Sequence, residues 1–159
     1  MRRRGLLYGK ILVPVDGSES NLRALQHAIL LAKDLKAELR LLHVVHDYWV
    51  ADGRHGLAKW GDLLADLREQ GLGILNEAAG IARNQGLEAQ SVSVETPMGS
   101  VGTAITDYAA QWPADLIVIG THGQRGIRRL VMGSDAEYIV RTAATPVLLV
   151  RATSAVPKD

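Results

Sequence analysis

Short apolar runs alternate along this chain with longer stretches in which apolar residues recur at helical spacing. Most of the runs are continuous, which is typical of strands buried on both faces of a parallel sheet. The runs predict strands at residues 10–15, 39–45, 115–119 and 146–150, and alternation of polar and apolar residues predicts a further strand at residues 90–95. The periodic stretches predict helices at residues 21–35, 57–84, 101–111 and 134–143. Such regular alternation favours a doubly wound, mostly parallel α/β sheet.

Two of the predicted helices carry local signals about where they begin and whether they are continuous. The first can begin after Ser18 or Ser20, because either residue is a favourable N-cap. The long stretch at residues 57–84 contains Gly71, Gly73 and Gly80. Because each glycine weakens a helix interior by about 1 kcal/mol, we expect a bent or interrupted helix there.

Length and composition indicate one ordinary globular domain. The chain has 159 residues, of which 47% are hydrophobic and 22% charged, and this is enough apolar material for a single core. We expect the domain at residues 10–151, a flexible basic tail at residues 1–9 and a flexible tail at residues 152–159. The formal net charge is +1, so the overall field is too weak to favour nucleic acid or a membrane as partner.

Cysteine content and the longest apolar runs bear on the cellular location. The chain contains no Cys, which excludes disulfides, thiolate catalysis and Cys-based zinc sites. No apolar run approaches the roughly 18 residues that span a bilayer. The run that follows Arg2, Arg3 and Arg4 is shorter than the roughly 7–15 apolar residues of a secretory signal. We therefore expect a cytoplasmic protein.

In an open parallel sheet the ligand crevice lies beyond the carboxyl ends of the strands, where the strand order reverses. The candidate binding segments are therefore residues 16–20, the residues from His46 onward, and residues 120–133. Asp16 follows the first strand, where its carboxylate suits ribose hydroxyls or a divalent cation. An Asx turn or an N-cap for the first helix is an equally good interpretation of Asp16.

The segment at residues 120–133 is rich in glycine and in positive charge. Its glycines are Gly120, Gly123, Gly126 and Gly133, and its titratable side chains are His122, Arg125, Arg128 and Arg129. Backbone amides in such a loop, together with the N-terminus of the helix that follows, form a natural phosphate site. A simple chain turn with solvated arginines and a capping box of Ser134 and Glu137 is the alternative, and the segment alone leaves it open.

Two familiar phosphate-binding patterns are absent from the chain. There is no G-x-x-x-x-G-K-[ST], and the turn Asp16-Gly17-Ser18 after the first strand lacks G-x-G-x-x-G. A P-loop NTPase and a standard NAD enzyme are therefore disfavoured.

The histidines give little sign of catalysis or of metal binding. His43 falls in a strand that we expect to be buried, which favours a hydrogen-bonded core histidine over a catalytic one. No pair of histidines has the spacing of a zinc site, and we expect no metal site made of protein ligands.

The spacing of the glycines resembles a family signature. Gly120-x2-Gly123-x9-Gly133-Ser134 matches the G-2x-G-9x-G-[S/T] pattern of ATP-binding universal stress proteins at every specified position. Further segments are similar to that family, namely Ile11-Leu-Val-Pro-Val-Asp16-Gly-Ser, Leu41-Leu-His-Val44, Asp115-Leu-Ile-Val-Ile-Gly120 and Thr145-Pro-Val-Leu-Leu-Val150. The resemblance covers residues 10–151.

The resemblance implies a fold and a dimer. The fold is a Rossmann-like α/β domain of the adenine nucleotide alpha hydrolase-like type, with an open parallel five-stranded sheet in the order 3-2-1-4-5 and helices on both faces. The dimer is a homodimer formed through the last strand, Val147 to Val150.

The resemblance also implies a ligand and the residues that contact it. ATP, ADP or AMP would occupy the crevice, with Mg²⁺ held through the phosphates and Asp16. The adenosine would lie beside Pro14, Val15 and Asp16, and the backbone of Val44 would hold the adenine. The phosphates and ribose would contact Gly120, Thr121, His122, Gly123, Gln124, Arg125, Gly126, Gly133, Ser134 and Asp135.

Asp135 departs from the family pattern, in which a small or apolar residue is more usual. An acid in the first turn favours the bare helix N-terminus. It repels a triphosphate unless a cation intervenes, and the arginines at 125, 128 and 129 offset this repulsion. We therefore expect ATP binding that depends on Mg²⁺.

Three classes of function follow from these residues. The leading one is an ATP-binding protein that senses or regulates in a stress response, with little or no hydrolysis, because the sequence identifies no set of base and metal ligands for phosphoryl transfer. The alternative is a nucleotide-free dimeric interaction module of the same fold. An adenylate-forming enzyme ranks last, because Asp16-Gly-Ser-Glu lacks the loops of that class.

Overall fold

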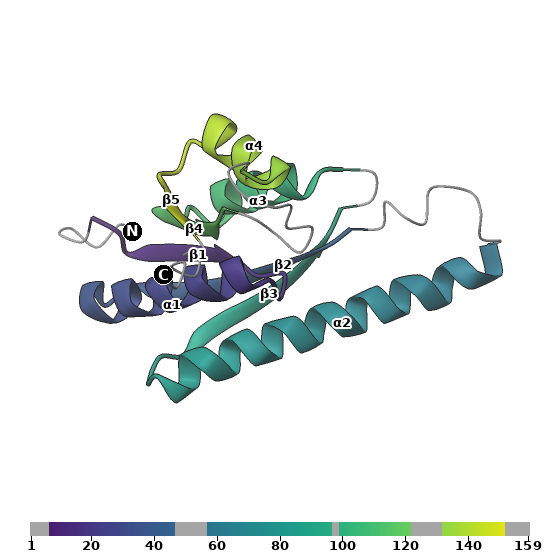
Figure 1. The fold of residues 1–159 in the computed structure, drawn as a ribbon, viewed down its shortest axis with the longest axis horizontal. Helices are drawn as coiled ribbons and strands as arrows, with labels where there is room; N and C mark the ends of the chain where they lie inside the picture. Colours follow the sequence, from purple (N-terminus) through teal and green to yellow (C-terminus); the bar gives the residue numbers. More distant parts are fainter. Residues whose placement is uncertain (1–6, 47–56, 97–98, 122–131, 152–159) are drawn as a thin grey trace, which may run out of the picture.

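The computed structural model describes residues 7–46, 57–96, 99–121 and 132–151, with residues 57–60 described by their backbone (Figure 1). Strands and helices alternate in the order β1 (Lys10–Pro14), α1 (Glu19–Leu35), β2 (Glu38–Val45), α2 (Leu57–Asn84), β3 (Ala89–Glu95), α3 (Val101–Gln111), β4 (Leu116–Gly120), α4 (Ser134–Thr142) and β5 (Val147–Val150). The strands form one sheet in the order β3-β2-β1-β4-β5, and every pairing is parallel. The predicted fold class and strand order are confirmed.

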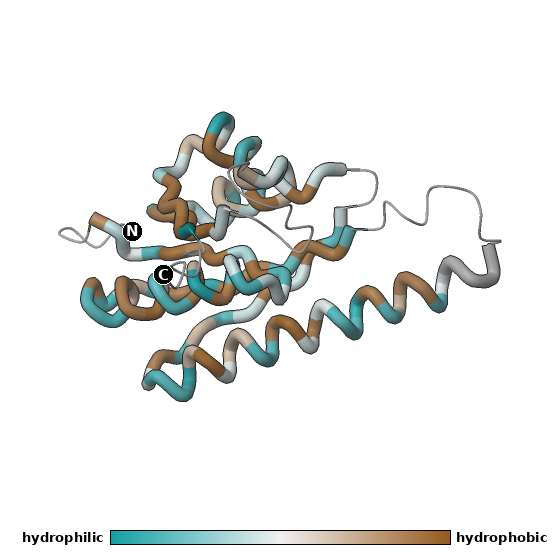
Figure 2. Tube along the Cα trace, in the orientation of Figure 1, coloured by the Kyte–Doolittle hydropathy of each residue, from teal (hydrophilic) through white to brown (hydrophobic). Residues whose placement is uncertain are grey.

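Helices cover both faces of the sheet, as Figure 1 shows with α1 and α2 on one side and α3 and α4 on the other. Alternate residues of β1 enter two separate cores. Ile11 and Val13 belong to the core under α1 and α2, and Leu12 belongs to the core under α3 and α4. All three side chains are fully buried. This two-sided burial is the physical reason for the continuous apolar runs in the sequence, which appear as brown strands in the middle of Figure 2.

The start of α1 is fixed by Ser18. Ser18 is the N-cap, and its hydroxyl accepts a hydrogen bond from the Asn21 amide at 3.3 Å. Ser20, the other candidate, lies inside the first turn and is buried. The sequence therefore predicted one correct cap out of two candidates, because both serines precede the same apolar pattern.

The prediction of a bent or interrupted helix at residues 57–84 is wrong. The whole stretch is one α-helix, α2, of 28 residues (Figure 1). Its second half buries Leu75, Ala78 and Ala82 against the sheet, and this packing outweighs the local cost of the glycines. At position 71 packing also explains why the residue is glycine, because an added Cβ would lie 2.6 Å from the His43 ring.

The residues directly before β1 also contact the rest of the fold. Tyr8 packs against the core under α1, and the amides of Gly9 and Lys10 each donate to Asp115 Oδ2 at 3.0 Å.

Within the described residues, no helix has the length and apolar character needed to cross a bilayer.

Candidate functional site

The ladder between β1 and β4 ends early, and this opens the sheet at its carboxyl edge. β1 remains paired with β2 as far as Pro14 and Leu42, whereas its last pairing with β4 joins Leu12 and Ile117. β1 and β4 are also the two strands at which the chain order reverses. The crevice expected at the switch point therefore lies between residues that follow Pro14 and residues that follow β4.

Asp16 follows directly on this opening. Its Oδ1 accepts a hydrogen bond from the Ser18 amide at 2.8 Å, which forms an Asx turn that leads into α1. Of the two roles that the sequence left open for Asp16, the structural one is present in the described residues. The same turn holds the carboxylate at the carboxyl edge of the sheet, beside the crevice.

Gly120, the first glycine of the motif, ends β4 in a crowded environment. An added Cβ would lie 2.7 Å from the Ser20 carbonyl oxygen and would also collide with the Ser20 hydroxyl. Its amide donates to Asn21 Oδ1 at 3.1 Å, so the first turn of α1 caps this edge of β4. Close approach of α1 is therefore a sufficient reason for glycine at this position, independent of any ligand.

The two ends of the glycine-rich segment are joined beside β4. The Thr121 amide donates to the Val150 carbonyl at 3.1 Å, and the Gly133 amide donates to the Thr121 carbonyl at 2.8 Å. The segment thus leaves β4 and returns at the same point. The predicted contacts at His122, Gly123, Gln124, Arg125 and Gly126 lie outside the described residues.

The capping box of Ser134 and Glu137, which the sequence left open as an alternative, is not formed. The N-cap of α4 is Gly133, which supplies no side-chain cap, and Ser134 is the first helical residue. Because Ser134 lies one position too late, its hydroxyl is not at the N-cap. The amides of the first turn are therefore left without a side-chain acceptor from the N-cap residue.

Asp135 has a structural role that the sequence did not indicate. Its Oδ1 accepts a hydrogen bond from the Gly102 amide at 3.2 Å, in the first turn of α3. A Cβ on Gly102 would lie 2.8 Å from the Tyr138 ring, so the starts of α3 and α4 pack closely. The acid therefore stabilises the N-terminus of a neighbouring helix as well as that of its own.

The hydrogen bond predicted for His43 is present, but the residue is not part of either core. Its Nδ1 lies 2.8 Å from the Val15 carbonyl oxygen, and the residue is half-buried in β2. Val44, the next residue along β2, is also half-buried and is paired with Val94 of β3. These residues place the end of β1 and the backbone of Val44 side by side at the carboxyl edge.

An ion pair fixes α2 to the end of β3. Arg68 Nε lies 2.6 Å from Glu95 Oε1, and Arg68 Nη2 lies 3.0 Å from Glu95 Oε2. The hydrogen bond from Arg68 lowers the pKa of the Glu95 carboxyl below its usual value, and the positive charge of Arg68 acts in the same direction. Both side chains are exposed, so the pair orients α2 more than it stabilises the fold.

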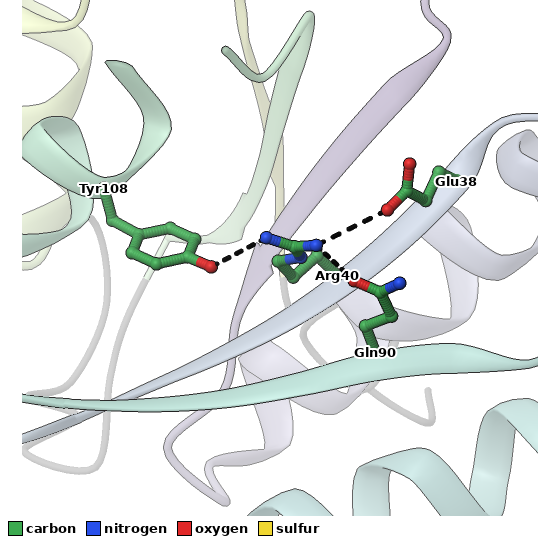
Figure 3. A network of polar contacts seen from close by, with 4 residues as sticks. All are labelled: Glu38, Arg40, Gln90 and Tyr108. Carbon is green, nitrogen blue, oxygen red and sulfur yellow. Dashed lines mark hydrogen bonds and ion pairs between the residues drawn. The ribbon is translucent and has the colours of Figure 1, made fainter. Parts of the chain in front are cut away.

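A polar cluster that the sequence did not predict lies at the opposite edge of the sheet, where the strands begin (Figure 3). Arg40 Nη1 donates to the Tyr108 hydroxyl at 2.9 Å, and Arg40 Nη2 contacts Glu38 and Gln90. The guanidinium lies over the Trp112 ring, 4.2 Å from its centroid. The cluster joins α3 to β2 and β3, away from the crevice, and its role is structural. A charged residue, Arg40, between two leucines of a strand was the available signal.

Groups of acidic residues and histidines that could hold a metal ion are not present among the described residues. A divalent ion bound beside Asp16 would therefore depend on ligand oxygens as well.

The match to a known protein family covers all of the strands and helices described above. Residues 7–151 match the model of the Universal stress protein family. The chain belongs to this family. A universal stress protein of Methanocaldococcus jannaschii is 35% identical over 145 residues, which cover 91% of this chain and 83% of that protein.

Two solved universal stress proteins resemble this one in structure. The universal stress protein UspA of Lactobacillus plantarum has a TM-score of 0.75 and 28% identity, covering 91% of this chain and 98% of its own. A universal stress protein solved in complex with cAMP has a TM-score of 0.67 and 26% identity, covering 91% of this chain and 97% of its own. The second structure is a complex of a family member with an adenine nucleotide.

Proposed function

We propose that this universal stress protein binds an adenine nucleotide at the carboxyl edge of its sheet, in the crevice between β1 and β4. The proposed ligand is ATP with Mg²⁺, and the proposed role is sensing or regulation in a cytoplasmic stress response, with little or no hydrolysis. The glycine spacing from Gly120 to Ser134, placed at this crevice, carries the proposal.

The start of α4 supports a phosphate site. Gly133 is joined to the end of β4 through its bond to Thr121, and it caps α4 with no side chain. First-turn amides without a side-chain cap, at the positive end of a helix, are suitable donors to phosphate oxygens. Asp16 follows β1, on the other side of the proposed crevice, and its carboxylate is suited to ribose hydroxyls or Mg²⁺.

The family relationship supports adenine as the base. A member that is 26% identical over most of this chain was solved with cAMP. We propose ATP, and not another adenine nucleotide, for two reasons. The G-2x-G-9x-G-[S/T] spacing is complete, and the positive charges of Arg125, Arg128 and Arg129 offset the negative charge of a triphosphate.

Isothermal titration calorimetry tests the proposal. The purified protein is titrated with ATP, ADP and AMP, each with and without Mg²⁺, and we expect saturable heat that is largest for ATP with Mg²⁺. Gly123→Val is expected to weaken binding, because its side chain would occupy space needed for backbone contact with the phosphates. Gly73→Ala is the matched control, because an added Cβ at Gly73 meets nothing within 4 Å.

A dimer through β5 is proposed as the assembly. β5 forms one end of the sheet, and Leu148 on it is 36% exposed. Such an edge has backbone groups and apolar side chains suited to pairing with a second copy. Light scattering of the purified protein tests this, with Leu148→Lys expected to shift it toward monomer.

The exposed β5 edge also favours the second candidate, a nucleotide-free dimeric interaction module. Native mass spectrometry separates the two candidates. Copurified adenine nucleotide supports the first, whereas a ligand-free dimer that gives no heat with ATP supports the second.

A further inference from the structure

The carbonyl of Val15, the residue that follows β1, is not bonded in the way that a continued ladder between β1 and β2 would require. In a pair of parallel strands, the amide and the carbonyl of one residue bond to two different residues of the partner strand. If the amide donates to the carbonyl of one partner residue, the carbonyl accepts from the amide of the partner residue two positions later. The Val15 amide donates to the Leu42 carbonyl at 2.8 Å, so the Val15 carbonyl should accept from Val44. Instead the Val15 oxygen lies 2.8 Å from His43 Nδ1, and within the described part of the chain no hydrogen bond joins it to the Val44 amide.

The backbone of Val44 is therefore open toward the crevice. Alternate residues of a strand direct their amide and carbonyl to opposite neighbours. The Val45 carbonyl accepts from the Thr96 amide at 3.0 Å, on the side of β3, so the Val44 amide and carbonyl face β1. Val44 thus presents a donor and an acceptor next to each other at the carboxyl edge, without a partner on β1 among the described residues.

The His43 ring is held in place from the far side by α2. Gly71 faces the imidazole so closely that a Cβ there would lie 2.6 Å from Cδ2 and 2.9 Å from Nε2. The ring is therefore confined between the end of β1 and the middle of α2. Because the Val15 oxygen can only accept, Nδ1 carries the proton in this contact.

We infer that His43 is a positioning residue for the part of the site that binds the adenine base. Because His43 donates a hydrogen bond to the Val15 carbonyl, the Val44 amide and carbonyl stay free to bind adenine. Adenine presents an acceptor at N1 beside a donor at N6, which complements this pair of backbone groups. The inference rests on the proposed function for its ligand, but the state of the Val44 backbone does not depend on nucleotide. His43 acts through Val15 and Val44 and does not itself contact the base.

Hydrogen exchange of the ligand-free protein tests the first half of the inference. In the wild type, we expect the Val44 amide to exchange faster than the paired amide of Leu42. In His43→Leu the released Val15 carbonyl accepts from Val44, and exchange of the Val44 amide slows by about tenfold or more. His43→Asn keeps a donor nitrogen at the position of Nδ1 and is expected to exchange like the wild type. Slow exchange of Val44 in the wild type, or no change in His43→Leu, overturns the inference.

Gly71→Ala reaches the same ring from α2 and guards against a folding defect in the His43 variants. Its Cβ displaces the imidazole, so the Val44 amide is expected to become protected as in His43→Leu. Gly73→Ala, in the same helix with open space around the new Cβ, is expected to leave Val44 unchanged. Equal exchange rates of the Val44 amide in Gly71→Ala and Gly73→Ala would contradict the proposed role of the His43 ring.

Calorimetry tests the second half. His43→Leu is expected to weaken ATP binding by about tenfold and to leave binding of inorganic tripolyphosphate within about twofold, while His43→Asn restores ATP binding. Equal weakening of both ligands, or no rescue by Asn, overturns the positioning role in favour of a general structural one. If the wild type binds no adenine nucleotide, the proposed function fails, and the exchange comparison still decides whether His43 keeps Val44 open.

Discussion

Alanine at Gly71 and at Gly73 should have opposite effects on stability, although both positions lie inside α2. Replacing glycine by alanine in a helix interior favours folding by about 1 kcal/mol. At Gly73 the new Cβ meets nothing within 4 Å, so this gain should appear in full. At Gly71 it lies 2.6 Å from the His43 ring, inside ordinary van der Waals contact.

The cost at Gly71 has two parts. Overpacking against a confined ring costs about 1–3 kcal/mol. Displacing the imidazole also breaks the 2.8 Å contact between His43 and the Val15 carbonyl, a hydrogen bond that contributes about 0.5–1.5 kcal/mol. After the helical gain is subtracted, Gly71→Ala should be less stable than the wild type by about 0.5–3.5 kcal/mol. Gly71→Ala and Gly73→Ala should therefore differ by about 1.5–4.5 kcal/mol.

Urea denaturation followed by circular dichroism measures this difference, provided that both variants keep the slope of the wild type. A double-mutant cycle isolates the cause. In a His43→Ala background the ring is gone, and Gly71→Ala should become neutral or stabilising like Gly73→Ala. If Gly71→Ala stabilises the wild-type background, or if its cost persists without the imidazole, the assigned packing of α2 against His43 is incorrect.

Three further predictions concern the edges of the crevice and the position of α2. Gly120→Ala should destabilise the fold by about 2–3 kcal/mol in urea denaturation, because the new Cβ meets backbone at the start of α1; an unchanged midpoint contradicts this. Asp135→Ala should cost about 0.5–1 kcal/mol by removing the acceptor for the Gly102 amide, and Asp135→Asn should cost less; equal costs would show that the hydrogen bond is unimportant. Because Arg68 lowers the pKa of Glu95, the ion pair contributes its full stabilisation of the fold above the unfolded glutamate pKa of about 4.3. This stabilisation is lost as the pH falls through the lower pKa of Glu95 in the folded protein. Carboxyl NMR should show the Glu95 midpoint rising in Arg68→Gln.

β1 and β4 were predictable because both of their faces are buried. Residues such as Leu12 and Val13 enter opposite cores, so no polar position interrupts the apolar run of β1 after Lys10. The same is true of β4, in which every residue is buried. The predicted strand ends differ from the observed ones by one residue, because the ends depend on neighbouring strands more than on local sequence.

The continuity of α2 was not predictable from glycine content. Local propensity treats Gly71, Gly73 and Gly80 alike, whereas the structure gives Gly71 a ring to contact and the other two open space. The contact partner, His43, is far away in sequence. Tertiary packing of the apolar face therefore decided the outcome against the summed local preferences.

The positions of the candidate residues at the carboxyl ends of β1 and β4 were predictable, but the contacts of these residues with the rest of the fold were not. The glycine spacing and the carboxyl ends of β1 and β4 follow from sequence pattern alone. The bond between Asp135 and Gly102 joins two helices 33 residues apart, and the approach of α1 to Gly120 joins positions 99 or more residues apart. Pairings of this kind have no local signature, so the sequence assigned those residues to the ligand without their structural roles.

Titration of the wild-type protein with ATP and Mg²⁺, compared with Gly123→Val in the same buffer, tests the central claim most directly. A saturable heat at one site per chain, strongly reduced in Gly123→Val, is the result expected of a nucleotide site at the crevice between β1 and β4. Absence of heat with ATP, ADP and AMP, with and without Mg²⁺, in a protein that copurifies with no nucleotide would contradict it.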